Sequence, residues 1–159
     1  MKRITLALAV TGVAAGMASA QQVPPSVVQY DEYGDVSEPL TATAGDPVQG
    51  RLVMASRGQG NCIACHAVSD MEEFPFHGEV GPPLDGVGDR WSEASLRGIV
   101  ANAKNVFPGT IMPAFYKVEG YVRPGDAFTG KAAEGDLDPL LTAQEIEDVV
   151  AYLMTLKEG

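Results

Sequence analysis

The chain has 159 residues, with 11 Lys and Arg against 21 Asp and Glu, so its formal charge is −10. This length fits one domain, and 45% hydrophobic with 20% charged residues indicates a globular protein rather than a disordered or fibrous one. The negative charge argues against nucleic acid or an anionic membrane surface as a partner. Outside the N-terminus no apolar run reaches about 20 residues, so no other segment is expected to span a bilayer.

The N-terminal segment 1–20 is typical of an export signal. Lys2 and Arg3 form a positive region, residues 4–15 are apolar, and Ala18-Ser19-Ala20 resembles a cleavage site. An uncleaved membrane anchor is the alternative, but the apolar stretch is short and rich in Gly and Ala. We predict cleavage after Ala20 and a periplasmic location. The mature chain of 139 residues would carry a charge of −12, because it loses two basic residues.

Residues 21–45 are polar and show no helical period, so we expect them to form an N-terminal extension before a domain at 46–159. Asp46 followed by Pro47 is typical of a helix start, with Asp46 as the N-cap. This first helix should end by the glycines at 58 and 60. Its Gly50 lacks a side chain, which would let Tyr152 of the last helix cross closely.

The two cysteines of the chain lie in the run Cys62-Ile63-Ala64-Cys65-His66. In an exported protein this pair could form a disulfide or a redox-active dithiol. The adjacent His66 favours another interpretation, because Cys-x-x-Cys-His is the attachment signature of c-type haem. Both thiols then form thioethers with the haem vinyl groups, and His66 supplies an iron ligand. We therefore expect covalently attached haem c.

A haem-ligating histidine needs an acceptor for its second ring nitrogen. Pro82, in Gly81-Pro82-Pro83-Leu84, is the candidate, although a plain turn explains the run almost as well. A second helix is expected to open at Trp91-Ser92-Glu93. Arg90 and Trp91 are candidates to bond the haem propionates; a solvated arginine and a core tryptophan are the alternatives.

The sixth iron ligand is sought among His77 and the methionines of the mature chain. Met154 lies on an apolar helical face and is expected in the core, while Met54 and Met71 are too near the attachment site. Met112 lies in a run with Pro108, Gly109 and Pro113 that stops any helix, so its thioether could reach the opposite haem face. We predict Met112 as the ligand and rank His77 second. A His/Met pair would raise the potential relative to a bis-histidine site.

A long connection, 114–140, is rich in Gly and Pro and precedes the last helix. Thr142 and Glu145 form a capping box at the start of that helix. Its apolar residues recur at helical spacing: Ile146, Val149, Val150, Leu153 and Met154. No β-type alternation competes, so the sequence predicts a small all-α haem domain.

Residues 47–157 resemble a class I cytochrome c, with Cys62, Cys65, His66, the Gly81-Pro82 loop, Arg90 and Met112 in the family order. More narrowly, three runs are similar to SoxX, the small monohaem subunit of the SoxAX cytochrome of bacterial thiosulfate oxidation. They are Gly60-Asn61-Cys62-Ile63-Ala64-Cys65-His66, Gly81-Pro82-Pro83-Leu84-Asp85-Gly86-Val87-Gly88-Asp89-Arg90-Trp91 and Met112-Pro113-Ala114-Phe115-Tyr116.

The resemblance implies an electron-transfer subunit of an L-cysteine S-thiosulfotransferase with one haem c. A larger, SoxA-like c-type cytochrome would be its partner and would carry the sulfur chemistry. Thiosulfate would be joined oxidatively to a cysteine of a SoxYZ-like carrier, and the electrons would pass to a soluble acceptor. Both cysteines here would be consumed as thioethers, so no catalytic residue is expected on this chain.

Two other functions stay open from the sequence. A free-standing periplasmic electron shuttle needs only the haem motif and Met112. A haem sensor or peroxidase needs an open sixth position, against which a firmly bound Met112 argues. Segments 21–45 and 114–140 fit no compact cytochrome, and we expect them to contact the larger subunit, with a mobile tail and loop as the alternative.

Overall fold

The computed structural model describes residues 21–125 and 129–158, and the expected export signal lies outside them. The α-helices of this part are α1 (Pro47–Ala55), α2 (Val87–Arg90), α3 (Glu93–Asn102) and α4 (Ala143–Leu153). Short 3-10 helices are η1 (Pro25–Val27), η2 (Cys62–Ala64), η3 (Ser69–Met71) and η4 (Ala103–Asn105). Within the described residues, pairing of extended chain is limited to two isolated bridges, Gln22–Thr41 and Gly125–Ala132. The predicted all-α architecture is confirmed.

The helix starts follow the predicted capping chemistry. The Asp46 carboxylate accepts a hydrogen bond from the Val48 amide, with Pro47 in the first turn of α1. Ser92 caps α3 through the Ser95 amide. At α4 the Thr142 hydroxyl accepts from the Glu145 amide and the Glu145 carboxylate accepts from the Thr142 amide, which completes the capping box.

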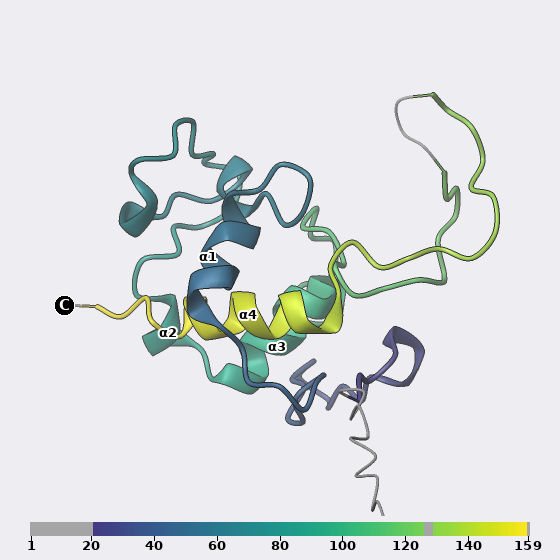
Figure 1. The fold of residues 1–159 in the computed structure, drawn as a ribbon, viewed down its shortest axis with the longest axis horizontal. Coiled ribbons are helices and arrows are strands. Elements are labelled where there is room, and N and C mark those ends of the chain that lie inside the picture. The colour runs from purple at the N-terminus through teal and green to yellow at the C-terminus, as the bar shows by residue number, and fades with distance from the viewer. Residues whose placement is uncertain (1–20, 126–128, 159) are drawn as a thin grey trace, which may run out of the picture.

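Helices α1 and α4 cross closely, with α3 beside α4 (Figure 1). Gly50 lies at the crossing, as expected, but its neighbour differs from the prediction. A Cβ at Gly50 would lie 1.9 Å from the Asp148 carbonyl oxygen, so the nearest part of α4 at Gly50 is the backbone at Asp148 and Val149 rather than the Tyr152 side chain. The reason is that α1 and α4 lie so close together at Gly50 that the backbone of one helix contacts the backbone of the other.

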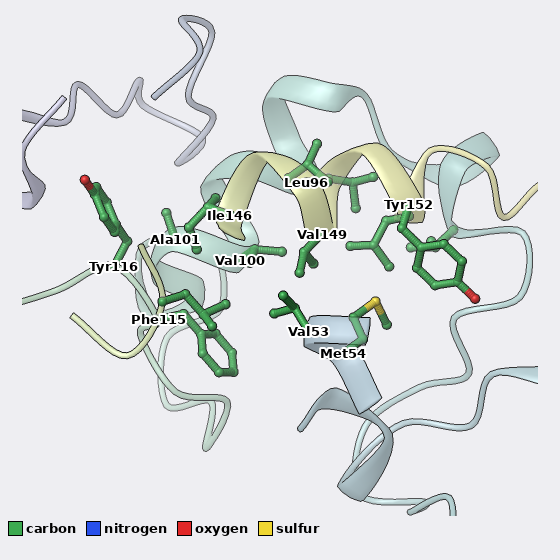
Figure 2. Packing of buried hydrophobic residues seen from close by; sticks show 14 of the residues in the cluster. Val53, Met54, Leu96, Val100, Ala101, Phe115, Tyr116, Ile146, Val149 and Tyr152 are labelled. Carbon is green, nitrogen blue, oxygen red and sulfur yellow. The ribbon is translucent and has the colours of Figure 1, made fainter. Parts of the chain in front are cut away.

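The core lies between these three helices and the segment after Met112. Figure 2 shows Val53 and Met54 of α1 facing Val149 of α4, with Phe115 closing one end. Tyr152 reaches out of the far end of α4, and its hydroxyl donates to Asp70 at 2.6 Å. Phe115 and Tyr116 are buried because the chain after Met112 returns to α3, where the Tyr116 amide donates to the Ala101 carbonyl.

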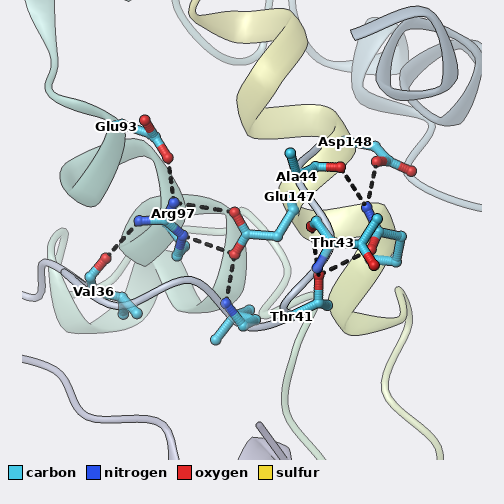
Figure 3. A network of polar contacts seen from close by, with 10 residues as sticks. Val36, Thr41, Thr43, Ala44, Glu93, Arg97, Glu147 and Asp148 are labelled. Carbon is cyan, nitrogen blue, oxygen red and sulfur yellow. Dashed lines mark hydrogen bonds and ion pairs between the residues drawn. The ribbon is translucent and has the colours of Figure 1, made fainter. Parts of the chain in front are cut away.

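A buried polar network joins the N-terminal extension to α3 and α4 (Figure 3). Arg97 and Glu147 are only 2% and 5% exposed, and the Arg97 guanidinium donates to both Glu147 carboxylate oxygens, at 2.8 and 3.1 Å. The same guanidinium donates to the Val36 carbonyl, and the Leu40 amide donates to Glu147. Val36 and Leu40 are themselves buried and belong to this domain's own core, whereas residues 37–39 between them are exposed. Any contact of 21–45 with another subunit is thereby confined to its exposed residues.

The connection between Tyr116 and α4 projects away from the helices as a long arm (Figure 1). Its two ends are held together, because the Leu141 amide donates to the Phe115 carbonyl and Leu141 is buried. Farther out, the Ala133 amide donates to the Pro124 carbonyl beside the Gly125–Ala132 bridge. None of the helices in the described residues has the length and apolar character needed to cross a membrane.

Candidate haem-binding site

The Cys-x-x-Cys-His segment is folded against the end of α1. The Gly60 amide donates to the Val53 carbonyl and the Asn61 amide to the Ser56 carbonyl, and Asn61 adopts a left-handed conformation with φ of +46°. The chain then enters η2, where the Cys62 carbonyl accepts from both Cys65 (3.1 Å) and His66 (3.0 Å). This tight turn brings both cysteines and the histidine into one short segment, with Cys62 half-buried and Cys65 exposed.

His66 has the acceptor that the sequence predicted. Its Nδ1 lies 2.7 Å from the Pro82 carbonyl oxygen, which fixes Nδ1 as the protonated nitrogen and leaves Nε2 free as a metal ligand. Gly81 allows this approach. A Cβ at Gly81 would lie 2.2 Å from His66 Cε1 and 2.6 Å from Nδ1, while the Gly81 amide donates to the Cys65 carbonyl at 2.8 Å.

The thiol chemistry disfavours a redox-active dithiol. Reactive Cys-x-x-Cys pairs depend on a thiol pKa that is lowered by nearby positive charge or a helix N-terminus. Here burial raises the pKa of the Cys62 thiol to about 12, so Cys62 is a poor nucleophile near neutral pH. The residues present therefore fit haem c: two thiols in the attachment spacing, an imidazole with one nitrogen free, and a side-chain-free position at Gly81 beside the imidazole.

The structure separates the four methionines within the described residues. Met54 and Met71 are completely buried in the core. Met154, predicted in the core, is the C-cap of α4 and is only partly buried against that core. Met112 differs, because it is half-buried at the core's edge in a loop without regular structure. Of these four, Met112 is therefore the one whose thioether is neither enclosed by the core nor carried by the end of a helix.

His77, the competing candidate, is held on the attachment segment. Its Nδ1 accepts from the Val68 amide at 3.2 Å, and the next amide, of Gly78, donates to the Ile63 carbonyl at 2.8 Å. Its Nε2 is buried and has no hydrogen-bond partner among the described residues. The first bond ties the His77 imidazole, and the second ties the backbone beside it, to the segment that carries His66, so Met112, on a separate loop, is the better candidate for the second iron ligand.

Arg90 contributes to the site in a way that the sequence did not reveal. Its guanidinium donates to the Asp85 carbonyl at 2.5 Å and to the Pro83 carbonyl at 2.9 Å. Arg90 thus supports the loop that carries Pro82, the acceptor for His66. Trp91 packs edge-on against Phe107 with 6.0 Å between ring centroids, and both rings are partly exposed. The predicted propionate contacts of Arg90 and Trp91 stay predictions.

The fold and the site define a class of protein. The cytochrome c family model matches residues 50–157, and the chain belongs to that family, whose members bind haem c covalently.

More narrowly, the chain is similar to a chain of the crystal structure of SoxXA from P. pantotrophus. The two are 55% identical, the match covers 86% of this chain and 99% of that one, and the TM-score is 0.82. This likeness supports the resemblance to SoxX that the three sequence runs indicated. No curated protein matches this chain.

Proposed function

We propose that this chain is the monohaem electron-transfer subunit of a SoxAX-type thiosulfate-oxidising complex. Cys62 and Cys65 would hold one haem c covalently, and His66 and Met112 would bind its iron. The observation that carries the proposal is the 2.7 Å contact between His66 Nδ1 and the Pro82 carbonyl, because it presets the imidazole of the attachment motif for metal binding. The 55% identity to a SoxXA chain supports the assignment to this type of complex.

Haem c would supply reversible one-electron chemistry when bound. The chain's own residues set its ligand field and keep it in place. The Pro82 carbonyl makes the His66 imidazole more electron-donating, while a Met112 thioether favours the reduced state relative to a second imidazole. Arg90 donates hydrogen bonds to the Asp85 and Pro83 carbonyls of the loop that carries Pro82. A change at Arg90 that moved this loop would therefore alter the hydrogen bond between Pro82 and His66.

The sulfur step belongs to the partner under this proposal. Joining thiosulfate to a carrier cysteine forms a sulfur–sulfur bond, releases the thiol proton and removes two electrons. A catalyst that carries the sulfur on its own cysteine during this step needs a free thiolate nucleophile, and both cysteines of this chain would be committed to haem attachment. Electrons from the coupling would leave the complex through this chain to a soluble carrier. We place the complex in the periplasm, after cleavage at Ala20.

The projecting arm between Tyr116 and α4 is the candidate contact with the larger, SoxA-like cytochrome. It exposes apolar side chains at its base and along its length, including Val122 (96% exposed), Tyr121 and Leu140. Lys117 lies over the Tyr121 ring at 5.0 Å and the Tyr121 hydroxyl donates to the Lys117 carbonyl, so this part of the arm is ordered by its own contacts. Exposed aromatic and aliphatic side chains on a preformed arm are typical of a protein interface.

The function is tested by following haem absorbance in rapid-mixing experiments. The complex of this chain with its larger partner is mixed with thiosulfate and a carrier protein that has a free cysteine. Reduction of the haem of this chain requires thiosulfate, carrier and partner together. Reduction of the isolated chain by thiosulfate alone, or no reduction in the full mixture, would contradict the proposal.

The partner contact is tested by Val122→Asp combined with Tyr121→Asp. We expect the double variant to weaken co-purification with the larger cytochrome, because two charges would be buried at the interface. Val48→Asp is the matched control, since Val48 is also strongly exposed but lies at the start of α1, away from the arm. Equal co-purification of wild type and the double variant would remove the arm from the interface.

A further inference from the structure

We infer that Lys104 is the positioning residue for the sixth ligand: its ammonium group fixes the backbone on both sides of Ile111 and so holds Met112 in place. This inference rests on the proposed role of Met112 as a haem ligand. The observation behind it is that Lys104 Nζ lies 2.6 Å from the Thr110 carbonyl oxygen and 2.7 Å from the Met112 carbonyl oxygen.

The loop around Met112 has little else to hold it. In the described chain, residues 111–114 make no backbone-to-backbone hydrogen bond. The nearest such bonds are that of the Thr110 amide to the Phe107 carbonyl on one side and that of the Leu141 amide to the Phe115 carbonyl on the other. One further contact comes from the Thr110 hydroxyl, which accepts from the Met112 amide at 3.2 Å. The Thr110 and Met112 carbonyl groups have the Lys104 ammonium group as their hydrogen-bond donor.

Lys104 is placed to do this by α3 and η4. It belongs to η4, which continues α3 directly, and its own amide donates to the Asn102 side chain at 3.3 Å. The ammonium group therefore starts from a rigid helix end and bridges eight residues forward to Met112. Among the described residues no carboxylate pairs with it, although the chain is rich in acidic groups. Its hydrogen bonds go to the loop carbonyls.

Pro113 supplies the complementary constraint. A proline disfavours the helical conformation in the residue before it, so Pro113 biases the backbone of Met112 toward extended geometry. That restriction sets the local conformation but does not fix where the loop lies relative to the domain. The Lys104 ammonium does so, through charge-assisted hydrogen bonds that are stronger than neutral ones. Together they give the thioether a preset position, which lowers the cost of keeping it on the iron.

The consequence is a sixth ligand that resists displacement. Without the ammonium group, the loop would hold the Met112 thioether less firmly toward the haem iron, and an external ligand would compete more easily. We expect Lys104→Met, which keeps an apolar side chain of similar length, to bind imidazole about tenfold more tightly in the oxidised state. The thioether-to-iron charge-transfer absorption band should weaken in the same variant. Lys104→Arg should retain most of both properties, because a guanidinium can also donate to two carbonyls.

The experiment is an imidazole titration of the oxidised holoprotein, read by absorbance, beside its thermal unfolding. Lys131→Met is the matched control, since it removes the same charge from the exposed arm. A lysine that only stabilised the fold would lower the unfolding temperature in Lys104→Met without changing imidazole affinity, and that result would overturn the inference. An equal effect of Lys131→Met would overturn it too, because net charge would then be the cause.

Met112→Ala separates this inference from the ligand assignment. If Met112→Ala keeps the absorption band and the wild-type imidazole affinity, Met112 is not the ligand, and both proposals fall. If Met112→Ala loses the band while Lys104→Met behaves as wild type, only the inference about Lys104 falls. Should Lys104→Met yield no folded holoprotein, Lys104→Gln takes its place. Its amide can donate to one of the two carbonyls, so an intermediate imidazole affinity is expected, and wild-type affinity would refute the role.

Discussion

Replacing Gly81 by alanine should displace the His66 imidazole relative to Pro82 without changing either of these residues. The new Cβ would lie 2.2 Å from His66 Cε1, whereas ordinary contacts begin at 3.4 Å, so the loop and the imidazole must separate by roughly 1 Å. In the holoprotein the imidazole is tethered by the attachment segment, and the Pro82 loop is therefore the part that yields. The His66–Pro82 contact, now 2.7 Å, would lengthen beyond hydrogen-bond distance.

Two quantities should change. Overpacking of this kind costs about 1–3 kcal/mol of stability. Loss of the hydrogen bond to Pro82 makes the imidazole less electron-donating, which destabilises the oxidised form relative to the reduced form. If about 1 kcal/mol of that bond is specific to the oxidised state, the potential rises by roughly 40 mV, by the one-electron conversion of 59 mV per tenfold change.

The assay is a redox titration followed by haem absorbance, with chemical unfolding of the same samples. Gly58→Ala is the matched control, because a Cβ at Gly58 would meet nothing within 4 Å. We expect its potential to equal that of the wild type. A Gly81→Ala protein that is folded, retains haem and shows an unchanged potential would refute the argument that the Pro82 contact tunes His66.

Four further predictions follow from the packing and the charges. Glu147→Gln should lower the free energy of unfolding by about 3 kcal/mol, because it breaks a buried ion pair with Arg97. Glu93→Gln, at the exposed end of the same network, should lower it by less than about 1 kcal/mol. Equal losses of stability in the two variants, measured by chemical unfolding, would contradict this prediction. Gly50→Ala should destabilise by roughly 1–3 kcal/mol, because its Cβ would lie 1.9 Å from the Asp148 oxygen, and wild-type stability would show that the helices can separate freely. Burial raises the pKa of Tyr30 to about 12, so its contribution to stability is complete below pH about 10 and is lost as the pH rises towards 12. Tyr30→Phe should therefore reduce the decrease in the free energy of unfolding between these pH values. An unchanged dependence of the unfolding free energy on pH would contradict this prediction. Cys62→Ala and Cys65→Ala should each leave a single covalent link to haem, and the double variant should lose haem staining after denaturing electrophoresis; retained staining in the double variant would contradict the attachment.

The features predicted correctly from the sequence are those in which a few neighbouring residues decide the structure. Asp46 and the Thr142–Glu145 pair cap their helices because capping depends only on the next three residues. Pro82 was predicted as the His66 acceptor because a haem-ligating histidine requires one and the proline run leaves its carbonyls free.

Other features depend on contacts between distant parts of the chain. Arg97 and Glu147 are buried as a pair 50 residues apart, and nothing in either local sequence distinguishes them from surface charges. Val36 and Leu40 lie in a segment without periodicity, so their burial against α3 and α4 could not be predicted from a pattern. Lys104 belongs to the same group, since its role depends on how η4 and the Met112 loop meet in space.

Native mass spectrometry of the protein from its native source, purified without denaturant, distinguishes an enzyme subunit from a free electron shuttle. We expect a complex of a larger c-type cytochrome with a chain whose mass equals residues 21–159 plus one haem, because thioether formation adds the haem without loss of atoms. A lone monomer carrying one haem would replace the enzyme-subunit assignment with a free electron shuttle. A chain without the added haem mass, or two hydrogens lighter as a disulfide would make it, would contradict the haem-binding site itself.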